Sequence, residues 1–373
     1  MVTLLFSGDF APLLKPNEIL DSHFSDIESL LQGCDLHITN MECPLTLSEK
    51  SIVKSGPSIK AHPQNIELLK QANVSVACLA NNHIFDFNEK GIIDTIEICK
   101  KNSIDCIGIV SRPDGNPHWL IKGVKGKRIG FLNYCEHEFS VRDQGQLGAN
   151  GYDPIKAFYD IKELRPLIDY LIVIYHGGNE YYPLPSPHLK KTFHYLVDLG
   201  ADAVIGHHTH VSSGYEIYNG KPLVYSLGNF FFPYKNEPAE WHQALLLKLI
   251  INNKIDLELI PINQCLNNQL KVNAAKQNDA NTVLEKVNRI SDVIKNDEEL
   301  QIAWSQYTIK RGVGLYKTIM FSNRIERLFF KLGILQDKRK QKARAITLSN
   351  IIRCSSLNEL LVTFFKNVTN RKI

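Results

Sequence analysis

Residues 200–211 read Gly-Ala-Asp-Ala-Val-Ile-Gly-His-His-Thr-His-Val, so a short apolar run is followed within five residues by three histidines. The run Ala203–Ile205 has the composition of a buried strand. A helix is expected just before it, because Ser186 suits the N-cap, Pro187 the first helical position and Gly200 the left-handed residue that ends the helix. A helix that leads into a buried strand is one unit of an α/β fold.

Short apolar runs of this kind recur through the first 250 residues. The other runs are Thr3–Ser7, Leu36–Thr39, Val74–Ala80, Ile129–Asn133, Leu171–Tyr175 and Leu223–Ser226, with amphipathic stretches such as Gln64–Gln71 and Lys90–Lys101 between several of them. Two further apolar runs flank residues 252–254 and predict a hairpin within Ala244–Ile262 that closes the sheet region. The alternation of strands and helices predicts an α/β fold with much parallel sheet.

Five of the runs end in polar side chains of the types that bind metal ions. In chain order these side chains are Asp9; Asn40 and Glu42; Asn81, Asn82 and His83; His176; and His207, His208 and His210. In open α/β sheets, ligands bind at the carboxyl ends of the strands. Carboxylate, carboxamide and imidazole groups suit divalent Zn, Mn or Fe. We therefore predict one shared polar site at this edge.

A site of this composition could hold two divalent metal ions, Mn, Zn or Fe, that activate a water together. The predicted ligands are Glu42 as a bridge, Asp9 and His210 on the first ion, and Asn82, His176 and His208 on the second. His83 follows a proposed ligand, so it could face the substrate and protonate a leaving oxygen as general acid.

These segments resemble the capsule synthesis CapA, or poly-γ-glutamate biosynthesis, family, which has a metallophosphatase-like fold of the calcineurin type. The matching segments are Gly8-Asp9, residues 40–46 (NMECPLT), 81–86 (NNHIFD), 176–181 (HGGNEY), 200–211 and 225–230 (YSLGNF). The resemblance covers about residues 1–250. It implies a four-layer α/β/β/α sandwich with a helical C-terminal extension, and it implies that His83 belongs to an Asn-His catalytic pair.

The sequence departs from the superfamily pattern at the first metal ligand. The usual motif is Asp-x-His, but Asp9 is followed by Phe10 and Ala11, so that histidine is missing. The bridging Asp is replaced by Glu42, and His207 is an extra residue before the final His-x-His. These departures predict that the first metal site is weak or empty.

A further set of residues could orient the ligands or contact substrate. They are Asn40, Asn81, Asp86, Glu180, Tyr181, His207, Ser226 and Asn229. For Glu180 and Tyr181 a structural loop, and for Ser226 and Asn229 a turn, is an equally good interpretation. His207 is better interpreted as a supporting residue than as a ligand.

The charge distribution separates the body from the tail. The net charge is +4, but residues 321–373 hold twelve Lys or Arg and three Asp or Glu, a net +9 that leaves residues 1–320 at −5. We divide the 373 residues into a domain at 1–265 and a basic, helical region at 266–373, joined through a polar linker at Asn267–Asp279. A mildly acidic body argues against a nucleic-acid partner.

The basic C-terminal region could contact a partner other than the substrate. Segment Asn323–Ala345 mixes apolar and basic residues and could lie on an anionic membrane surface, although a helix packed on the body is the favoured alternative. The eight cysteines form no C-x-x-C pair, and the start of the chain has no signal-peptide pattern. We therefore expect a cytoplasmic protein with reduced thiols.

Three functions are compatible with these residues. The leading one is a metal-dependent hydrolase of phosphoesters, with an anionic small molecule or polymer as substrate. The family resemblance adds an amide hydrolase or transferase acting on poly-γ-glutamate. A non-catalytic assembly subunit with a degenerate metal site is the third, and the missing histidine after Asp9 favours it, whereas an intact Asn82-His83 pair favours an enzyme.

Overall fold

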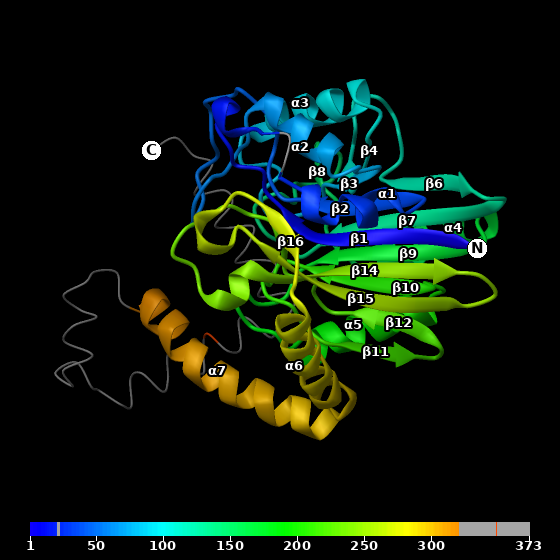
Figure 1. Cartoon of the computed structure of the whole chain (residues 1–373), viewed down its shortest axis with the longest axis vertical. Helices are drawn as coiled ribbons and strands as arrows, with labels where there is room; N and C mark the ends of the chain where they lie inside the picture. The colour runs from blue at the N-terminus through cyan, green and yellow to red at the C-terminus, as the bar shows by residue number, and fades with distance from the viewer. Residues whose placement is uncertain (21–22, 321–347, 349–373) are drawn as a thin grey trace. The chain divides into compact units, whose positions relative to one another are not determined.

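The computed structural model describes residues 1–20, 23–320 and 348 of the chain (Figure 1). Contacts divide the chain into two compact units, Met1–Trp304 and Ser305–Ile373. The first unit holds both large sheets and every predicted site residue. The basic segment Asn323–Ala345 lies outside the described residues, so the expected membrane contact stays a prediction.

The first sheet has eight strands in the order β16-β15-β14-β1-β2-β3-β4, with β13 also paired to β1. Their bounds are β1 Val2–Phe10, β2 Leu36–Met41, β3 Val76–Cys78, β4 Asp105–Ile107, β13 Asn229–Phe231, β14 Gln243–Ile251, β15 Ile255–Gln264 and β16 Val272–Ala274. Strands β1 to β4 are parallel. The predicted hairpin is confirmed, because β14 and β15 are antiparallel neighbours beside β1.

The second sheet has six strands in the order β11-β12-β10-β9-β7-β6. Their bounds are β6 Trp119–Val124, β7 Lys127–Cys135, β9 Tyr170–His176, β10 Ala203–His207, β11 Tyr215–Tyr218 and β12 Lys221–Val224, and a separate small pair is formed by β5 Ile109–Val110 and β8 Gly148–Ala149. Strands β7, β9, β10 and β12 are parallel. The residues alone did not predict this second sheet, but the family resemblance did, and it is present.

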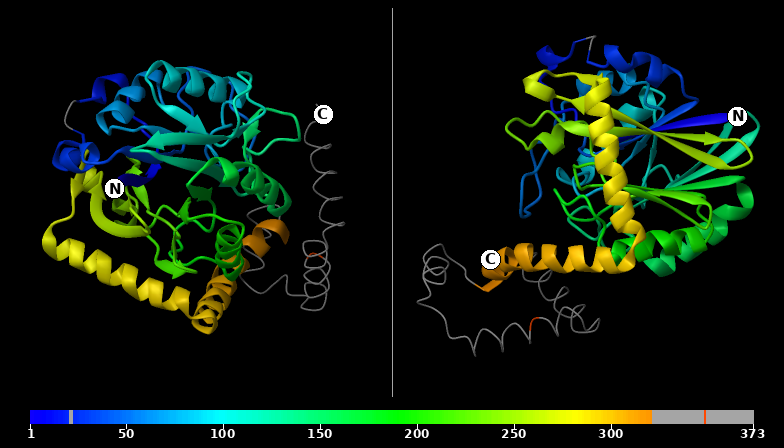
Figure 2. Two further views of the ribbon diagram at one scale, coloured as in Figure 1. Left: turned by 90° about the vertical axis from the view of Figure 1, so that its right-hand side faces the viewer. Right: turned by 60° about the horizontal axis from the view of Figure 1, so that its bottom comes forward.

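Helices cover the outer faces of both sheets. The helices are α1 Glu28–Gln32, α2 Ile66–Gln71, α3 Asn88–Lys101, α4 Pro154–Leu164, α5 Pro187–Asp198, α6 Gln277–Lys295 and α7 Asp297–Met320. Residues of α1, α2 and α3 pack on the first sheet, and residues of α4 and α5 pack on the second. Figures 1 and 2 show α2 and α3 on one side of the paired sheets and α5 on the other. The four-layer α/β/β/α prediction is confirmed.

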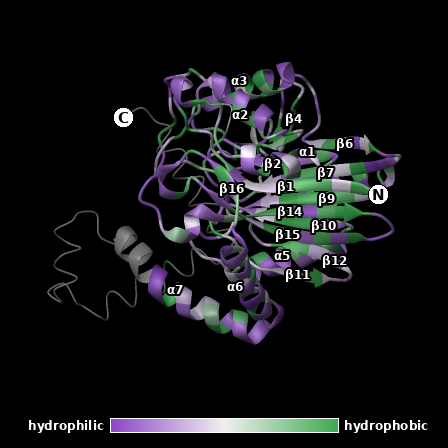
Figure 3. Cartoon of the chain, in the orientation of Figure 1, coloured by the Kyte–Doolittle hydropathy of each residue, from purple (hydrophilic) through white to green (hydrophobic). Residues whose placement is uncertain are grey.

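The interior between the sheets is apolar because each central strand is buried on both faces. In β1, Leu4 and Phe6 point into the core between the sheets, whereas Leu5 packs under the helices. Figure 3 shows the resulting hydrophobic colour along β1, β9, β10 and β14. A strand covered on both faces reads as a continuous apolar run, which explains why the runs were visible in the sequence.

The segment after residue 265 differs from the expected linker. Strand β16 lies within this segment and pairs antiparallel with β15. Val272 of β16 is fully buried against the first sheet. Helix α6 then adds Val283 and Val287 to the core between the sheets. The helical character predicted for this region is therefore right for α6 and α7, and the linker prediction is wrong.

Two observations concern the predicted location of the chain and the predicted state of its cysteines. Across the part of the chain that the structure describes, no helix combines the length and the apolar composition needed to cross a membrane. All seven cysteines in that part are free, and Cys354 lies outside it. The cytoplasmic location stays a prediction.

Candidate metal centre

The strand ends of both sheets meet at one edge. Asp9 lies near the end of β1, and Asn40 is its register partner on β2. His207 and His176 are register partners at the ends of β10 and β9. His208 also donates its backbone N–H to Asp9 Oδ2 at 3.2 Å, which joins the two sheets at this edge. The predicted convergence of strand-end side chains is present in the structure.

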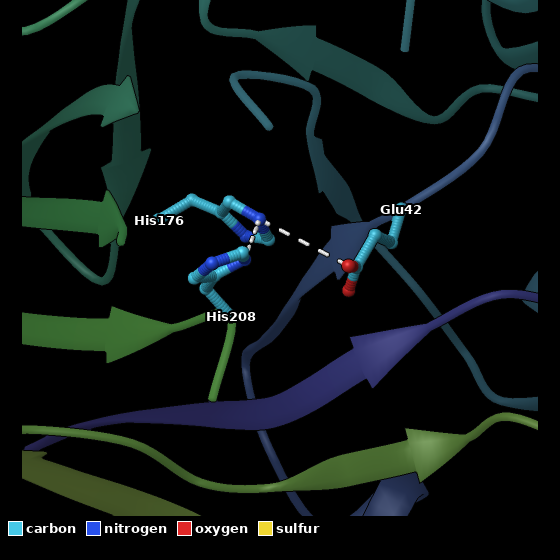
Figure 4. A group of neighbouring side chains, drawn as sticks. All are labelled: Glu42, His176 and His208. Carbon is cyan, nitrogen blue, oxygen red and sulfur yellow. Dashed lines mark hydrogen bonds and ion pairs between the residues drawn. The ribbon is translucent and has the colours of Figure 1, made fainter. Parts of the chain in front are cut away.

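Two groups of donor atoms share one carboxylate. Asp9, Glu42 and His210 form the first group, and Glu42, His176 and His208 form the second, with donor atoms within 4.8 Å of one another in each. Glu42 Oε1 lies 3.6 Å from His210 Nε2 and 3.9 Å from His176 Nε2. Figure 4 shows His176 and His208 pointing toward the Glu42 carboxylate. Glu42 therefore occupies the position predicted for a bridge.

The sixth predicted ligand lies beside the second group. Asn82 Oδ1 is 3.0 Å from His176 Nε2, and the same nitrogen is 3.1 Å from His208 Nδ1. An amide oxygen and an imidazole nitrogen that face the same point can both contact one cation. Asn82 is therefore placed to complete the second group.

The donor set fits divalent cations. Glu42 Oε1 is buried and has no hydrogen-bond partner, which is costly for a carboxylate oxygen unless something else contacts it. Asp9 and Glu42 are both fully buried, and two carboxylates side by side repel each other. A divalent ion at each group would remove both costs, and imidazole with carboxylate is a donor set that suits Zn, Mn and Fe.

Burial and neighbouring groups shift the pKa values of the isolated ligand residues in different directions. Burial would lower the pKa of His210, but its contact with Asp9 raises that pKa. Burial, with the nearby carboxylates of Asp9 and Glu180, raises the pKa of Glu42 well above its usual range. Burial would also raise the pKa of Asp9, but hydrogen bonds from His207 and His210 hold it well below its usual range. Burial lowers the pKa of His176 and of His208, so both imidazoles are neutral and ready to bind a metal.

The ligand loop after β10 has an unusual backbone. His208 and His210 have φ values of 96° and 59°, a region that residues other than glycine rarely occupy. Just before them, a Cβ on Gly206 would lie 2.1 Å from the carbonyl oxygen of Tyr225, so only glycine fits. Backbone strain of this kind persists where the surroundings fix it, and it often marks a functional site.

Asparagine side chains hold the ligands in place. Asn40 Nδ2 donates to Asp9 Oδ1 at 2.8 Å and to Glu42 Oε2 at 3.3 Å. Asn229 Oδ1 lies 2.9 Å from His210 Nδ1, which must carry the proton because a carbonyl oxygen only accepts. The other nitrogen of His210 is then free on the side of Glu42. Asn40 and Asn229 therefore contact predicted ligands directly, and their orienting role stays a prediction.

The remaining predicted residues have more varied surroundings. Asn81 Nδ2 donates to the carbonyl of Met41, and its Oδ1 accepts from the amide of His83, so it shapes the loop. His207 Nδ1 lies 3.2 Å from Asp9 Oδ1, beside the cluster. Ser226 Oγ accepts from the amide of Gly228, which is the turn role.

The sequence matches a known family over most of the sandwich. Residues 3–234 match the family described as bacterial capsule synthesis protein PGA_cap. The chain belongs to this family. The capsule biosynthesis protein CapA of Bacillus anthracis is 26% identical over 276 residues, which are 70% of this chain and 67% of that protein. The PGA biosynthesis protein CapA of Bacillus subtilis is 30% identical over 234 residues, 61% of each chain.

Solved structures give a weaker likeness. A phosphatase from Mycoplasma pneumoniae has a TM-score of 0.43 at 18% identity and covers 70% of this chain and 93% of its own. A hypothetical protein from Thermus thermophilus has a TM-score of 0.45 at 18% identity, with 70% and 98% covered. Neither likeness carries an argument about the activity of this PGA_cap family member.

His83 lies outside both donor groups and is held by other residues. Its Nδ1 lies 2.7 Å from Asp86 Oδ2, and its side chain is 13% exposed. Lys54 forms an ion pair with Asp86 and lies 3.1 Å from His83 Nδ1. The amide of Ile59 donates to the same Asp86 carboxylate. Asp86 therefore orients the ring of His83 through Nδ1.

Three residues near the centre were not predicted from the sequence: Lys54, Glu136 and Glu138. Glu136 and Glu138 follow β7 and line a small hollow with Asn82, His176 and His208. Burial raises the pKa of Glu136 to about 7. The run Ile129–Asn133 was recognised as a strand, so the residues after it could have been assigned to the same edge. Lys54 lies in a loop without a motif, and no spacing rule connects it to His83.

Proposed function

We propose that this chain is a metal-dependent phosphoester hydrolase that holds two divalent ions, Mn, Zn or Fe. The observation that carries the proposal is Glu42, a buried carboxylate shared by two donor groups and left without a hydrogen-bond partner at Oε1. Bound ions of this kind supply an activated water and positive charge for the oxygens of a phosphoryl group.

The two ion sites differ in their ligands. Asp9, Glu42 and His210 would hold the first ion, and the two residues after Asp9 add no imidazole. Glu42, Asn82, His176 and His208 would hold the second. The second site would therefore bind its ion more tightly than the first.

His83 serves as the general acid in this proposal. Asp86 accepts a hydrogen bond from His83 Nδ1, so only the imidazolium form carries a second proton, on Nε2, that a leaving oxygen could take. Lys54 neutralises the Asp86 carboxylate, which is itself fully buried. His83 directly follows the predicted ligand Asn82 in the chain, so it lies next to the proposed metal centre without being one of its ligands.

The biological role in this proposal is the synthesis of a capsule or of poly-γ-glutamate. The support is family membership and the names of the two Bacillus relatives. Hydrolysis of an amide in poly-γ-glutamate is the alternative, since an activated water attacks a carbonyl carbon as well as a phosphorus atom.

Elemental analysis followed by an activity assay tests the proposal. Protein loaded with Mn²⁺ or Zn²⁺ is expected to hold two ions per chain and to hydrolyse phosphomonoesters or phosphodiesters, but not γ-glutamyl amides. The variant Glu42→Gln should lose both metal and activity, whereas His188→Ala, an exposed histidine on α5, should keep both. Turnover of the amides alone would establish the alternative, and loaded protein without any turnover would contradict an enzyme.

A further inference from the structure

Two buried aromatic rings pack against His210, the imidazole of the first donor group. The Trp241 ring lies 4.7 Å from the His210 ring, measured between centroids, with an interplanar angle of 41°. The Phe232 ring contacts the same imidazole edge-on, at 5.3 Å and 86°. Trp241 and Phe232 also contact each other, at 5.0 Å, and both are buried. The orientation of His210 is therefore determined by packing as well as by hydrogen bonds.

Trp241 is itself held firmly in the segment between β13 and β14. Its indole Nε1–H donates to the carbonyl of Phe232 at 3.2 Å. Its own carbonyl accepts from Gln264 Nε2 at 2.9 Å and from Asn229 Nδ2 at 3.3 Å. The same Asn229 side chain accepts from His210 Nδ1 through Oδ1, at 2.9 Å. Trp241 thus acts on His210 directly, through its ring, and indirectly, through Asn229.

The left-handed backbone of His210, with φ at 59°, makes this support necessary. A residue with a side chain keeps such a conformation only where its surroundings hold it. Without the Trp241 ring, the cavity left beside the imidazole would let His210 turn Nε2 away from Glu42 Oε1, now 3.6 Å away. In the second donor group the rings of His176 and His208 lie 4.7 Å from each other instead. The two groups therefore differ in what holds their imidazoles.

We infer that Trp241 is a positioning residue for the first metal ion and for that ion alone. Its ring keeps the His210 imidazole turned toward Glu42, so the affinity of the first site depends on Trp241 and the affinity of the second does not. The inference rests on the two-ion centre of the proposed function and adds a residue that acts through a ligand. Because the first donor group holds a single imidazole, displacement of His210 leaves that ion with carboxylates only.

Calorimetric titration of the metal-free protein with Mn²⁺ tests the inference, and the binding step that is lost in His210→Ala identifies the first ion. Trp241→Leu should raise the Kd of the first ion by roughly 10- to 100-fold, the usual effect of changing a residue that orients a metal ligand, and leave the Kd of the second unchanged. Trp241→Phe keeps a ring against His210 and should retain most of the affinity.

Phe193→Leu is the matched control, because Phe193 is a fully buried ring on α5 that stacks on Tyr225 at 4.9 Å. This variant should lose stability and keep both Kd values. Equal weakening of both ions in Trp241→Leu, or an unchanged Kd for the first ion, would overturn the inference.

Tryptophan emission gives a second readout that does not need Trp241→Leu to fold. Co²⁺ quenches an indole at short range, so emission of the unaltered protein should fall as the first site fills, and Trp241→Phe should lack this component. Quenching that follows the second ion alone, or that persists in Trp241→Phe, would overturn the inference. Neither measurement needs turnover. If the first ion depends on Trp241 but no ester is hydrolysed, the proposed function fails and the inference stands; hydrolysis with both Kd values unchanged in the Trp241 variants would do the reverse.

Discussion

His83 and Asp86 show how single residues divide the work at this site. Asp86 is fully buried and accepts from the Ile59 amide while it contacts His83 and Lys54. Such a carboxylate sets the orientation of an imidazole and the nitrogen that faces the substrate. His83 was predicted from the sequence, and Asp86 was assigned only a general supporting role, because the sequence does not show which of several acids lies beside the ring.

The variant His83→Ala tests the acid role. Turnover of esters with poor leaving groups should fall by roughly 10²–10⁴-fold, the usual worth of a positioned acid. Esters of nitrophenol should be affected much less, because nitrophenolate leaves without a proton. Metal content, measured by elemental analysis, should not change. Loss of metal would make His83 a ligand, and an equal loss of rate for both classes of ester would make it a positioning residue.

Glu136 gives a pH dependence of stability in the metal-free protein. Burial raises the pKa of its carboxyl from 4.5 to about 7, so the folded state binds a proton more tightly than the unfolded state. Its contribution to the free energy of unfolding is therefore present below about pH 4.5 and is lost as the pH rises to about 7, by on the order of 3 kcal/mol. In urea unfolding, the free energy of unfolding of Glu136→Gln should rise relative to that of the unaltered protein between pH 5 and 7. Above pH 7 the difference between the two proteins should stay constant. Parallel curves for the two proteins would contradict the raised pKa of the half-buried Glu136.

Helix α5 shows what the sequence can define at the scale of one element. Ser186 was predicted as the N-cap, and its Oγ accepts from the amide of Leu189 at 3.0 Å. Gly200 was predicted to be left-handed, and its φ is 121°. Leu189 and Phe193 face the second sheet as the apolar stripe required. These signals depend on residues that are close together in the sequence. They can therefore be recognised without knowledge of the tertiary contacts.

The variant Ser186→Ala should lower the free energy of unfolding by about 1 kcal/mol, because one helix-end amide loses its partner. Ser186→Asp keeps an acceptor at the N-cap and should be close to the original stability. Chemical unfolding of the metal-loaded proteins measures both changes. Equal stability for Ala and Asp variants would show that the cap contributes nothing here.

The pairing of strands cannot be predicted from the residue pattern of a single strand. The apolar runs placed β1, β2, β9 and β10 well, but the pairing of β13 with β1 and of β16 with β15 was not predicted. Both β13 and β16 have three residues, too few for a periodic pattern. Val272 is buried by the pairing of β16 within a segment that otherwise reads as polar.

At the scale of the whole molecule, the site is the edge at which two sheets meet. The centre of the site could be predicted from the sequence because Asp9, Glu42 and His176 each lie at the end of a recognisable apolar run. The sequence did not predict the surroundings, since Lys54 and Trp241 reach the site from segments that only the folded chain brings there. The fold and the strand-end residues could thus be predicted from short-range patterns, whereas residues that reach the site from other segments, such as Lys54 and Trp241, could not.

The central claim is that Glu42 is shared by two metal ions, and anomalous diffraction from crystals grown with Mn²⁺ or Zn²⁺ tests it most directly. We predict two anomalous peaks about 4 Å apart, each within about 2.5 Å of a Glu42 carboxylate oxygen. One peak should lie beside Asp9 and His210, and the other beside His176 and His208. A single peak, or peaks that do not contact Glu42, would contradict the shared centre.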